Sequence, residues 1–158
     1  MNTEDDRFIR AAIELSAKHS RAGHGGPFGA VIVRGGEIIG EGWNRVTSDN
    51  DPTAHAEIIA IRAACAKIGS FKLNGCVLYT SCEPCPMCLG AAYWARLDRM
   101  VFAATRLDAA AAGFDDEELY RELVMPIGSR KLPMRQLLRK EAAAVMDEWR
   151  RMPDKKPY

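Results

Sequence analysis

Apolar residues recur at three- and four-residue intervals between Asp5 and Arg21, and this spacing predicts an amphipathic helix. Thr3 precedes the segment and Gly23 follows it, and residues of these types cap and end helices. Two β-rich runs come next and are joined by Gly35-Gly36, a two-residue turn that predicts an antiparallel hairpin. The expected strands are 28–34 and 37–43, and the polar segment 44–54 is expected to be a loop.

Helical and strand-like segments alternate after residue 54. One helix is expected to open with His55 and end before Gly69, and Pro86, which suits a first helical turn, opens another. The expected helices are 55–68, 86–96, 117–123 and 141–152, and the expected strands are 76–80, 99–104 and 132–138. This order predicts an α/β fold with a mixed sheet, whose later strands are parallel and whose ligands gather beyond the carboxyl ends of the strands.

Composition narrows the class of protein. The 158 residues are 47% hydrophobic and 27% charged, which suits one compact domain. The formal charge of +1 gives no strong field toward phosphate or anionic lipid and favours a small neutral substrate. No segment approaches the ~18 apolar residues of a membrane span, and no signal peptide is apparent, so we expect a cytoplasmic protein without a membrane partner.

Basic residues outnumber acidic ones from about Ser129 onward, and this bias keeps a nucleic-acid partner under consideration. The charges are spread at mixed spacing along an expected helix, which is typical of a solvated face. Nucleic acid is therefore not the expected partner.

Three of the five cysteines lie in the segment CEPCPMC (82–88), a spacing that indicates a metal site in a reducing compartment. Cys85 and Cys88 are three residues apart in a first helical turn, so their sulfurs share one face. His55 also opens a helix and can reach the same ion. These three ligands predict a zinc site with a fourth position for water, whose pKa zinc lowers from ~16 to about 7.

Glu57 follows His55 by two residues, so on a helix its carboxylate is directed away from the imidazole. This placement suits a group that transfers protons to and from the water rather than binding the metal. The combination of His55-Ala56-Glu57 with Pro84-Cys85-Pro86-Met87-Cys88 also matches the H-x-E and P-C-x-x-C signature of zinc nucleobase deaminases.

Two noncatalytic interpretations of the same residues stay open. Cys82 could join His55, Cys85 and Cys88 and close a structural zinc site without water. Alternatively the three cysteines could hold an iron–sulfur cluster, although a fourth cysteine does not follow at the usual spacing.

The sequence resembles bacterial guanine deaminases, members of the cytidine-deaminase-like superfamily, over nearly its whole length. The resemblance is carried by GGPFGA (25–30), NDPTAHAE (50–57), YTSCEPCPMC (79–88), YWAR (93–96), AGFDD (112–116) and KKPY (155–158). Asp51 to Glu57 and the cysteine run also resemble tRNA adenosine deaminases. The pieces that resemble guanine deaminases and not the tRNA enzymes are Tyr93-Trp94, Gly113-Phe114-Asp115-Asp116 and the tail that ends at Tyr158. The resemblance implies a single deaminase domain, 1–158, with a three-layer α/β/α fold: a mixed five-stranded sheet, an antiparallel N-terminal hairpin and helices on both faces.

The resemblance also implies roles for individual residues around a purine. Phe28 and Trp94 would pack on the ring, Asn44 would hydrogen-bond its polar edge, and Asp116 would accept from its N–H groups and help to move protons. Considered without the resemblance, the two aromatic residues could belong to the core, and Asp116 could cap the helix that follows it.

The implied function is hydrolytic deamination of guanine to xanthine and ammonia in purine salvage or catabolism, with one Zn²⁺ per subunit. A homodimer is implied too, in which segments of about 141–158 are exchanged and Tyr158 closes the partner's pocket. The alternatives are deamination of guanosine, a triazine, cytosine or tRNA adenosine, and a noncatalytic zinc-stabilised module.

Overall fold

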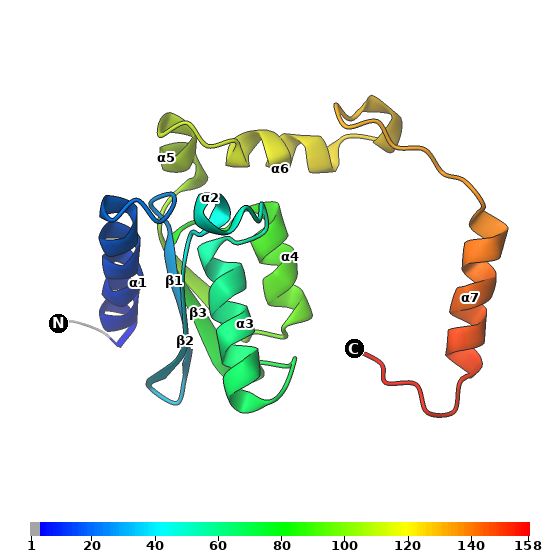
Figure 1. Cartoon of the computed structure of the whole chain (residues 1–158), viewed down its shortest axis with the longest axis horizontal. Coiled ribbons are helices and arrows are strands. Elements are labelled where there is room, and N and C mark those ends of the chain that lie inside the picture. The colour runs from blue at the N-terminus through cyan, green and yellow to red at the C-terminus, as the bar shows by residue number, and fades with distance from the viewer. Residues whose placement is uncertain (1–3) are drawn as a thin grey trace. The chain divides into compact units, whose positions relative to one another are not determined.

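The computed structural model describes residues 4–158 and confirms an α/β fold (Figure 1). The elements in chain order are α1 (Glu4–Arg21), β1 (Gly29–Arg34), β2 (Glu37–Trp43), α2 (Val46–Asp49), α3 (Ala56–Ile68), β3 (Cys76–Cys82), α4 (Pro86–Trp94), β4 (Arg99–Ala104), α5 (Arg106–Ala111), α6 (Asp116–Val124), the 3₁₀ turn η1 (Ile127–Ser129) and α7 (Arg139–Arg151). The expected cap Thr3 lies outside the described residues.

Four strands form one mixed sheet in the order β2-β1-β3-β4. β1 pairs antiparallel with β2 and with β3, whereas β3 and β4 run parallel, as expected for the later strands. Gly35 and Gly36 both have positive φ, 56° and 79°, which is the backbone that a two-residue hairpin turn requires. The carboxyl ends of β2, β3 and β4 therefore share one edge of the sheet.

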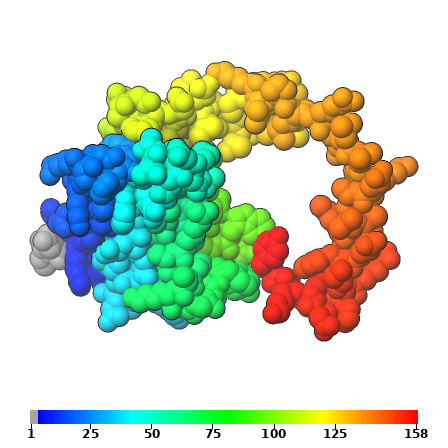
Figure 2. All heavy atoms as spheres, in the orientation of Figure 1, coloured from blue at the N-terminus to red at the C-terminus, as the bar shows by residue number. Residues whose placement is uncertain are grey.

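Alternate residues of β1 build two separate cores. Ala30 and Ile32 pack with α3, while Val31 and Val33 pack with Phe8 of α1 on the opposite face. Figure 1 shows α1 on one side of the sheet and α3 and α4 on the other. Phe8 is fully buried, and burying such a side chain contributes about 1.5–3 kcal/mol. Figure 2 shows the residues from α1 to α3 packed into one continuous body.

Glycines on the strands let the helices lie close to the sheet. A Cβ on Gly42 would collide with the carbonyl oxygen of Ala56, and one on Gly40 would collide with that of Ala60. Gly29 makes the same close approach to Ala12 of α1 on the other face. Gly40 and Gly42 of β2 thus determine how closely α3 approaches the sheet. The same two residues affect the position of His55, which directly precedes α3.

The expected fifth strand at 132–138 is wrong. Within the described residues the sheet has four strands, and 132–138 has no regular structure and only exposed side chains. Pro133 removes one backbone donor from this segment, and no neighbouring strand supplies a hydrogen-bonding partner. The alternation of apolar residues alone does not make a strand.

Two short helices were not anticipated. α2 lies inside the expected loop 44–54, and α5 follows β4 directly. Thr105 and Asp108 form a capping box at the start of α5. The pattern T-x-x-D was therefore a usable signal for this helix.

The described chain divides into two compact units, one ending at Tyr120 and the other beginning at Arg121. The second unit contains η1 and α7, and none of its side chains is buried. No helix within residues 4–158 has the length and apolar character needed to cross a membrane.

Candidate metal centre

The three expected zinc ligands come together at two helix starts. His55 is the N-cap of α3 and Cys85 is the N-cap of α4, and Cys88 lies in the first turn of α4. One potential ligand atom from each residue lies within 4.8 Å of the others, and His55 Nδ1 is 3.6 Å from Cys85 Sγ. Neither N-cap side chain makes a capping hydrogen bond at the start of its helix.

Hydrogen bonds within the group shift the pKa values of all three side chains. The hydrogen bond between Cys85 and Cys88 lowers the pKa of the Cys85 thiol to about 4 and raises the pKa of Cys88. The hydrogen bond to Cys85 also raises the pKa of His55 above its usual value. Two sulfurs and one imidazole form a donor set that fits zinc, which binds thiolate sulfur and histidine nitrogen tetrahedrally.

Cys82 does not join this group. Its Sγ lies 3.5 Å from the carbonyl oxygen of Thr105, and burial raises the pKa of its thiol to about 11. Among residues 4–158, the only cluster of His, Cys, Asp and Glu close enough for a metal consists of His55, Cys85 and Cys88. The structure thus argues against a closed four-ligand zinc site and against a cysteine-bound cluster.

Glu57 lies beside the ligands in the first turn of α3. Its side chain is buried, Oε1 accepts from Thr80 Oγ1 at 3.3 Å, and Oε2 accepts from Cys88 Sγ at 3.4 Å. Burial raises the pKa of this carboxyl group. A carboxyl group with a raised pKa and fixed geometry is suited to taking up and releasing a proton near neutral pH.

A cavity of about 220 Å³ opens onto the metal centre at the edge of the sheet where β2, β3 and β4 end. Its described lining consists of Gly26, Phe28, Asn44, Val46, Thr47, His55, Glu57, Glu83, Cys85, Phe114 and Asp116. Six of the site residues expected from the sequence therefore line one cavity. They are Phe28, Asn44, His55, Glu57, Cys85 and Asp116.

Asn44 is held in a fixed orientation in the cavity wall. The residue is 7% exposed, and its Oδ1 accepts from the backbone N–H of Gly26 at 3.2 Å and of Val46 at 3.3 Å. Because the oxygen is engaged, the amide nitrogen is the group that Asn44 can offer to an acceptor on a ligand.

Phe114 is a cavity residue that the sequence reasoning did not single out. Its ring meets that of Phe28 edge to face, with centroids 4.7 Å apart and planes at 78°. Its place in the motif AGFDD, beside Asp116, was the available signal. Asp116 is the first residue of α6, and burial raises the pKa of its carboxyl group.

Two expected substrate contacts are not among the residues that line this cavity. Trp94 ends α4 and is 61% exposed, and Tyr158 ends the second unit and is 75% exposed. Their contact with a purine stays a prediction.

Comparison with known proteins agrees with this geometry. A family model described as the cytidine and deoxycytidylate deaminase zinc-binding region matches residues 2–104. Guanine deaminase from Bacillus subtilis is 51% identical over 153 residues, which cover 97% of this chain and 98% of that protein. The X-ray structure of a Bacillus subtilis guanine deaminase superposes with a TM-score of 0.93 at the same coverage.

Two further relatives are more distant. A guanine deaminase from Nitrosomonas europaea has a TM-score of 0.65 at 32% identity, covering 89% of this chain and 81% of that one. A tRNA-specific adenosine deaminase from Haemophilus influenzae is 41% identical and covers 78% of this chain and 75% of its own length.

Proposed function

Because this chain belongs to the zinc-dependent deaminase family that includes the guanine deaminases, we propose that it hydrolyses guanine to xanthine and ammonia. The observation that carries the proposal is the position of Glu57, buried next to Cys88 and facing a small cavity with aromatic and acidic walls. The similarity to a guanine deaminase also continues through 97% of the chain, well beyond residue 104.

His55, Cys85 and Cys88 are the residues that would hold zinc. When bound, zinc supplies a Lewis acid that activates water at neutral pH. Glu57 takes a proton from the attacking water and returns it to a ring nitrogen of the substrate. Its hydrogen bond with Thr80 fixes the carboxylate while these transfers occur.

The walls of the cavity suit a planar base. Phe28 and Phe114 offer apolar faces and edges to the ring, and Asn44 offers N–H donors to an oxygen or nitrogen acceptor. Asp116, once ionised, accepts from the amino and ring N–H groups of guanine and assists the departure of ammonia. Adenine presents a different order of donors and acceptors on the same edge, so it would leave these groups unpaired.

We also propose that the chain acts as a homodimer that exchanges its terminal segments, about 141–158, with Tyr158 covering the partner's cavity. Three apolar residues share one face of α7, namely Val145 (64% exposed), Met146 (72%) and Trp149 (42%). A helix of this length is only marginally stable in isolation, and in proteins such helices gain most of their stability by packing an apolar face against other elements. A second copy would supply the surface on which this face packs.

The test of function is a substrate panel on the zinc-loaded protein. Guanine, guanosine, cytosine, adenine and tRNA are incubated separately, and ammonia release and ultraviolet absorbance are followed. We expect turnover of guanine and its loss in Glu57→Ala at unchanged zinc content. If another amine were turned over faster than guanine, that amine would be assigned as the substrate. If no amine were turned over by the zinc-loaded protein, the zinc site would be assigned a structural role.

The dimer has its own test. Met146→Glu places a charge on the apolar face of α7, and sedimentation equilibrium should show a dimer for the parent chain and dissociation at low micromolar concentration for the variant. Lys140→Gln, also on α7, serves as the charge control because it lowers the net charge by the same single unit. A monomeric parent chain with full activity would contradict the exchange.

A further inference from the structure

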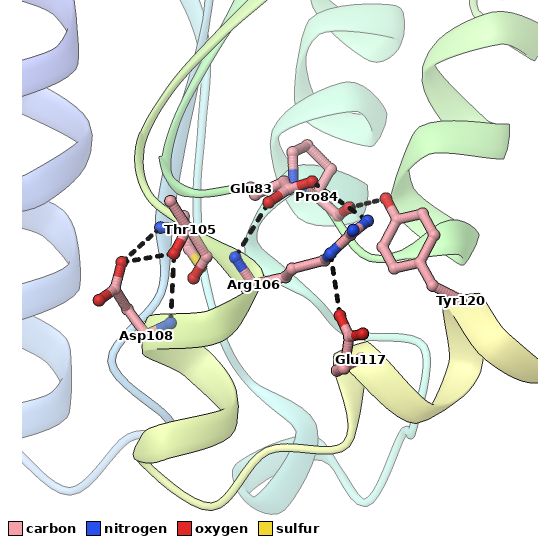
Figure 3. Close-up of polar contacts among 8 residues, drawn as sticks. Glu83, Pro84, Thr105, Arg106, Asp108, Glu117 and Tyr120 are labelled. Atoms are coloured by element: carbon pink, nitrogen blue, oxygen red, sulfur yellow. Dashed lines mark hydrogen bonds and ion pairs between the residues drawn. The ribbon is translucent and has the colours of Figure 1, made fainter.

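Arg106, the first residue of α5, lies between two acidic residues from different parts of the chain (Figure 3). Its Nε is 2.9 Å from Glu117 Oε2, and its Nη1 is 3.8 Å from Glu83 Oε1. Its backbone N–H also donates to Glu83 Oε2 at 3.0 Å. Arg106 thus contacts the loop between β3 and α4 through Glu83, and it contacts α6 through Glu117.

Tyr120 makes a second link between the same two segments. The guanidinium carbon of Arg106 lies 4.8 Å from the centroid of the Tyr120 ring. The hydroxyl of Tyr120 donates to the carbonyl oxygen of Pro84 at 2.7 Å, and Pro84 directly precedes the ligand Cys85 (Figure 3). Together, Arg106 and Tyr120 fasten α6 to the loop that carries the metal ligand.

The position of Arg106 is itself fixed by the capping box at the start of α5. Asp108 accepts from the N–H and the hydroxyl of Thr105, at 2.8 and 2.7 Å, and returns a bond from its own N–H to Thr105 Oγ1 at 3.3 Å (Figure 3). The backbone of the neighbouring Arg106 is therefore constrained before its side chain reaches either acid.

These contacts bear on the cavity because they hold two of its walls. Glu83 and Cys85 line one wall, and Phe114 and Asp116 line another, with Asp116 next to Glu117. Three acids and no Lys or Arg occur among the lining residues that the structure describes. Arg106 compensates the charge of Glu83 from outside the cavity.

The partners of Arg106 are only partly exposed, 25% for the Glu83 side chain and 24% for Glu117, whereas Arg106 itself is 40% exposed. Ion pairs at this exposure contribute little to folding stability. They can nevertheless set geometry, because several directional contacts converge on one guanidinium.

We propose that Arg106 is a positioning residue for the purine cavity, which holds the start of α6, and with it Phe114 and Asp116, against the Pro84-Cys85 loop. The effect of Arg106 on catalysis rests on the proposed deaminase function. Its effect on the position of α6 does not.

The decisive variant is Arg106→Ala, assayed with guanine as zinc-loaded protein. A displacement of about 1 Å in a catalytic cavity can cost ~10²-fold, so we expect kcat/KM to fall about 10- to 100-fold, mainly through a higher KM. Zinc content and melting temperature should match those of the parent chain. Arg106→Lys should recover only part of the loss, because an ammonium group cannot reproduce the guanidinium fork.

Arg99→Ala is the matched control. Arg99 also pairs with a carboxylate, Asp5, at 2.7 Å and lies over a tyrosine ring, that of Tyr79, at 5.8 Å, but neither partner lines the cavity. Its kcat/KM should stay within about twofold of the parent value, as expected for a surface pair. Tyr120→Phe, which keeps the ring and loses the bond to Pro84, should raise KM in the same direction as Arg106→Ala.

Hydrogen exchange separates this inference from the assignment of function. Arg106→Ala should speed exchange of the backbone amides of residues 116–120, and Arg99→Ala should not. Unchanged exchange and unchanged KM in Arg106→Ala would overturn the proposal, as would a loss of activity explained entirely by lost zinc. A parent chain without guanine turnover would refute the proposed function and the catalytic effect of Arg106, while faster exchange would still establish that Arg106 holds α6.

Discussion

The two units of this chain use apolar residues in opposite ways. Up to Tyr120, apolar side chains are buried in two cores, one on each face of the sheet. From Arg121 onward no side chain is buried, although α7 carries a continuous apolar face. The first unit therefore holds both buried cores and the three residues that could bind a metal, whereas the apolar face of α7 is not buried within the second unit.

This difference separates two requirements of catalysis. The proposed metal ligands His55, Cys85 and Cys88 and the proposed proton carrier Glu57 all belong to the first unit. The proposed cover of the cavity, Tyr158, belongs to the second. Changes in the first unit should thus affect chemistry or metal, and changes in the second should affect substrate retention without affecting metal.

Glu57→Gln should have the largest effect. The amide keeps the size of the side chain but cannot accept the proton of the attacking water, so kcat should fall about 10²- to 10⁴-fold, the usual contribution of general acid–base catalysis. Zinc measured by atomic absorption should stay at one ion per subunit. Activity that survives this change would remove Glu57 from its role.

Deletion of Lys155–Tyr158 tests the second unit. We expect turnover of guanine to fall more than about tenfold because the cavity loses its cover and the substrate is held less well in place. Zinc content should not change, since no metal ligand lies in the tail. Equal activity of the shortened and parent proteins would contradict the division of roles.

Phe114→Ala tests the aromatic wall of the cavity. Removing the Phe114 ring takes away one aromatic contact with the bound base, and such a contact contributes about 0.5–1.5 kcal/mol, so KM for guanine should rise roughly 2- to 12-fold. Steady-state kinetics measures the change, and Phe71→Ala, which alters a phenylalanine that is 53% exposed and does not line the cavity, is the control.

Asp5→Asn should have the smallest effect and should appear only in stability. Hydrogen bonds from Arg99 and Tyr79 lower the pKa of Asp5 from its ordinary value of 3.8 to about 2. A depressed carboxyl pKa adds stability above about pH 4, and that contribution is lost as the pH falls toward 2. The melting temperature of the variant should thus be slightly lower at pH 7 and equal to that of the parent near pH 2. A difference that persists at pH 2 would point to another cause.

The ligand set could be predicted because it depends on local spacing and helix starts. Cys85 and Cys88 share a turn wherever the helix lies, and Pro86 marks its beginning. The hairpin at Gly35-Gly36 was predictable for the same reason, since its turn type is decided by two adjacent residues.

Features that depend on distant partners were not predictable in this way. The segment 132–138 has a strand-like composition, but a strand requires a neighbour whose free edge the sequence does not reveal. Likewise, the sequence around Phe114 does not distinguish it from an ordinary apolar residue. Its role becomes visible only in the structure, where its ring contacts that of Phe28 in the cavity. The capping pattern at Thr105 was local and was missed because β4 directly precedes it.

The bare Cα of Gly42 has a consequence for the metal itself. Since no side chain separates β2 from the carbonyl of Ala56, the backbone on either side of that residue, at His55 and Glu57, is seated directly on the sheet. A methyl group at position 42 would lift the imidazole and the carboxylate together, away from sulfurs anchored on another helix. The distance between the His55 imidazole and the sulfurs of α4 thus depends on a residue of the neighbouring strand that has no side chain.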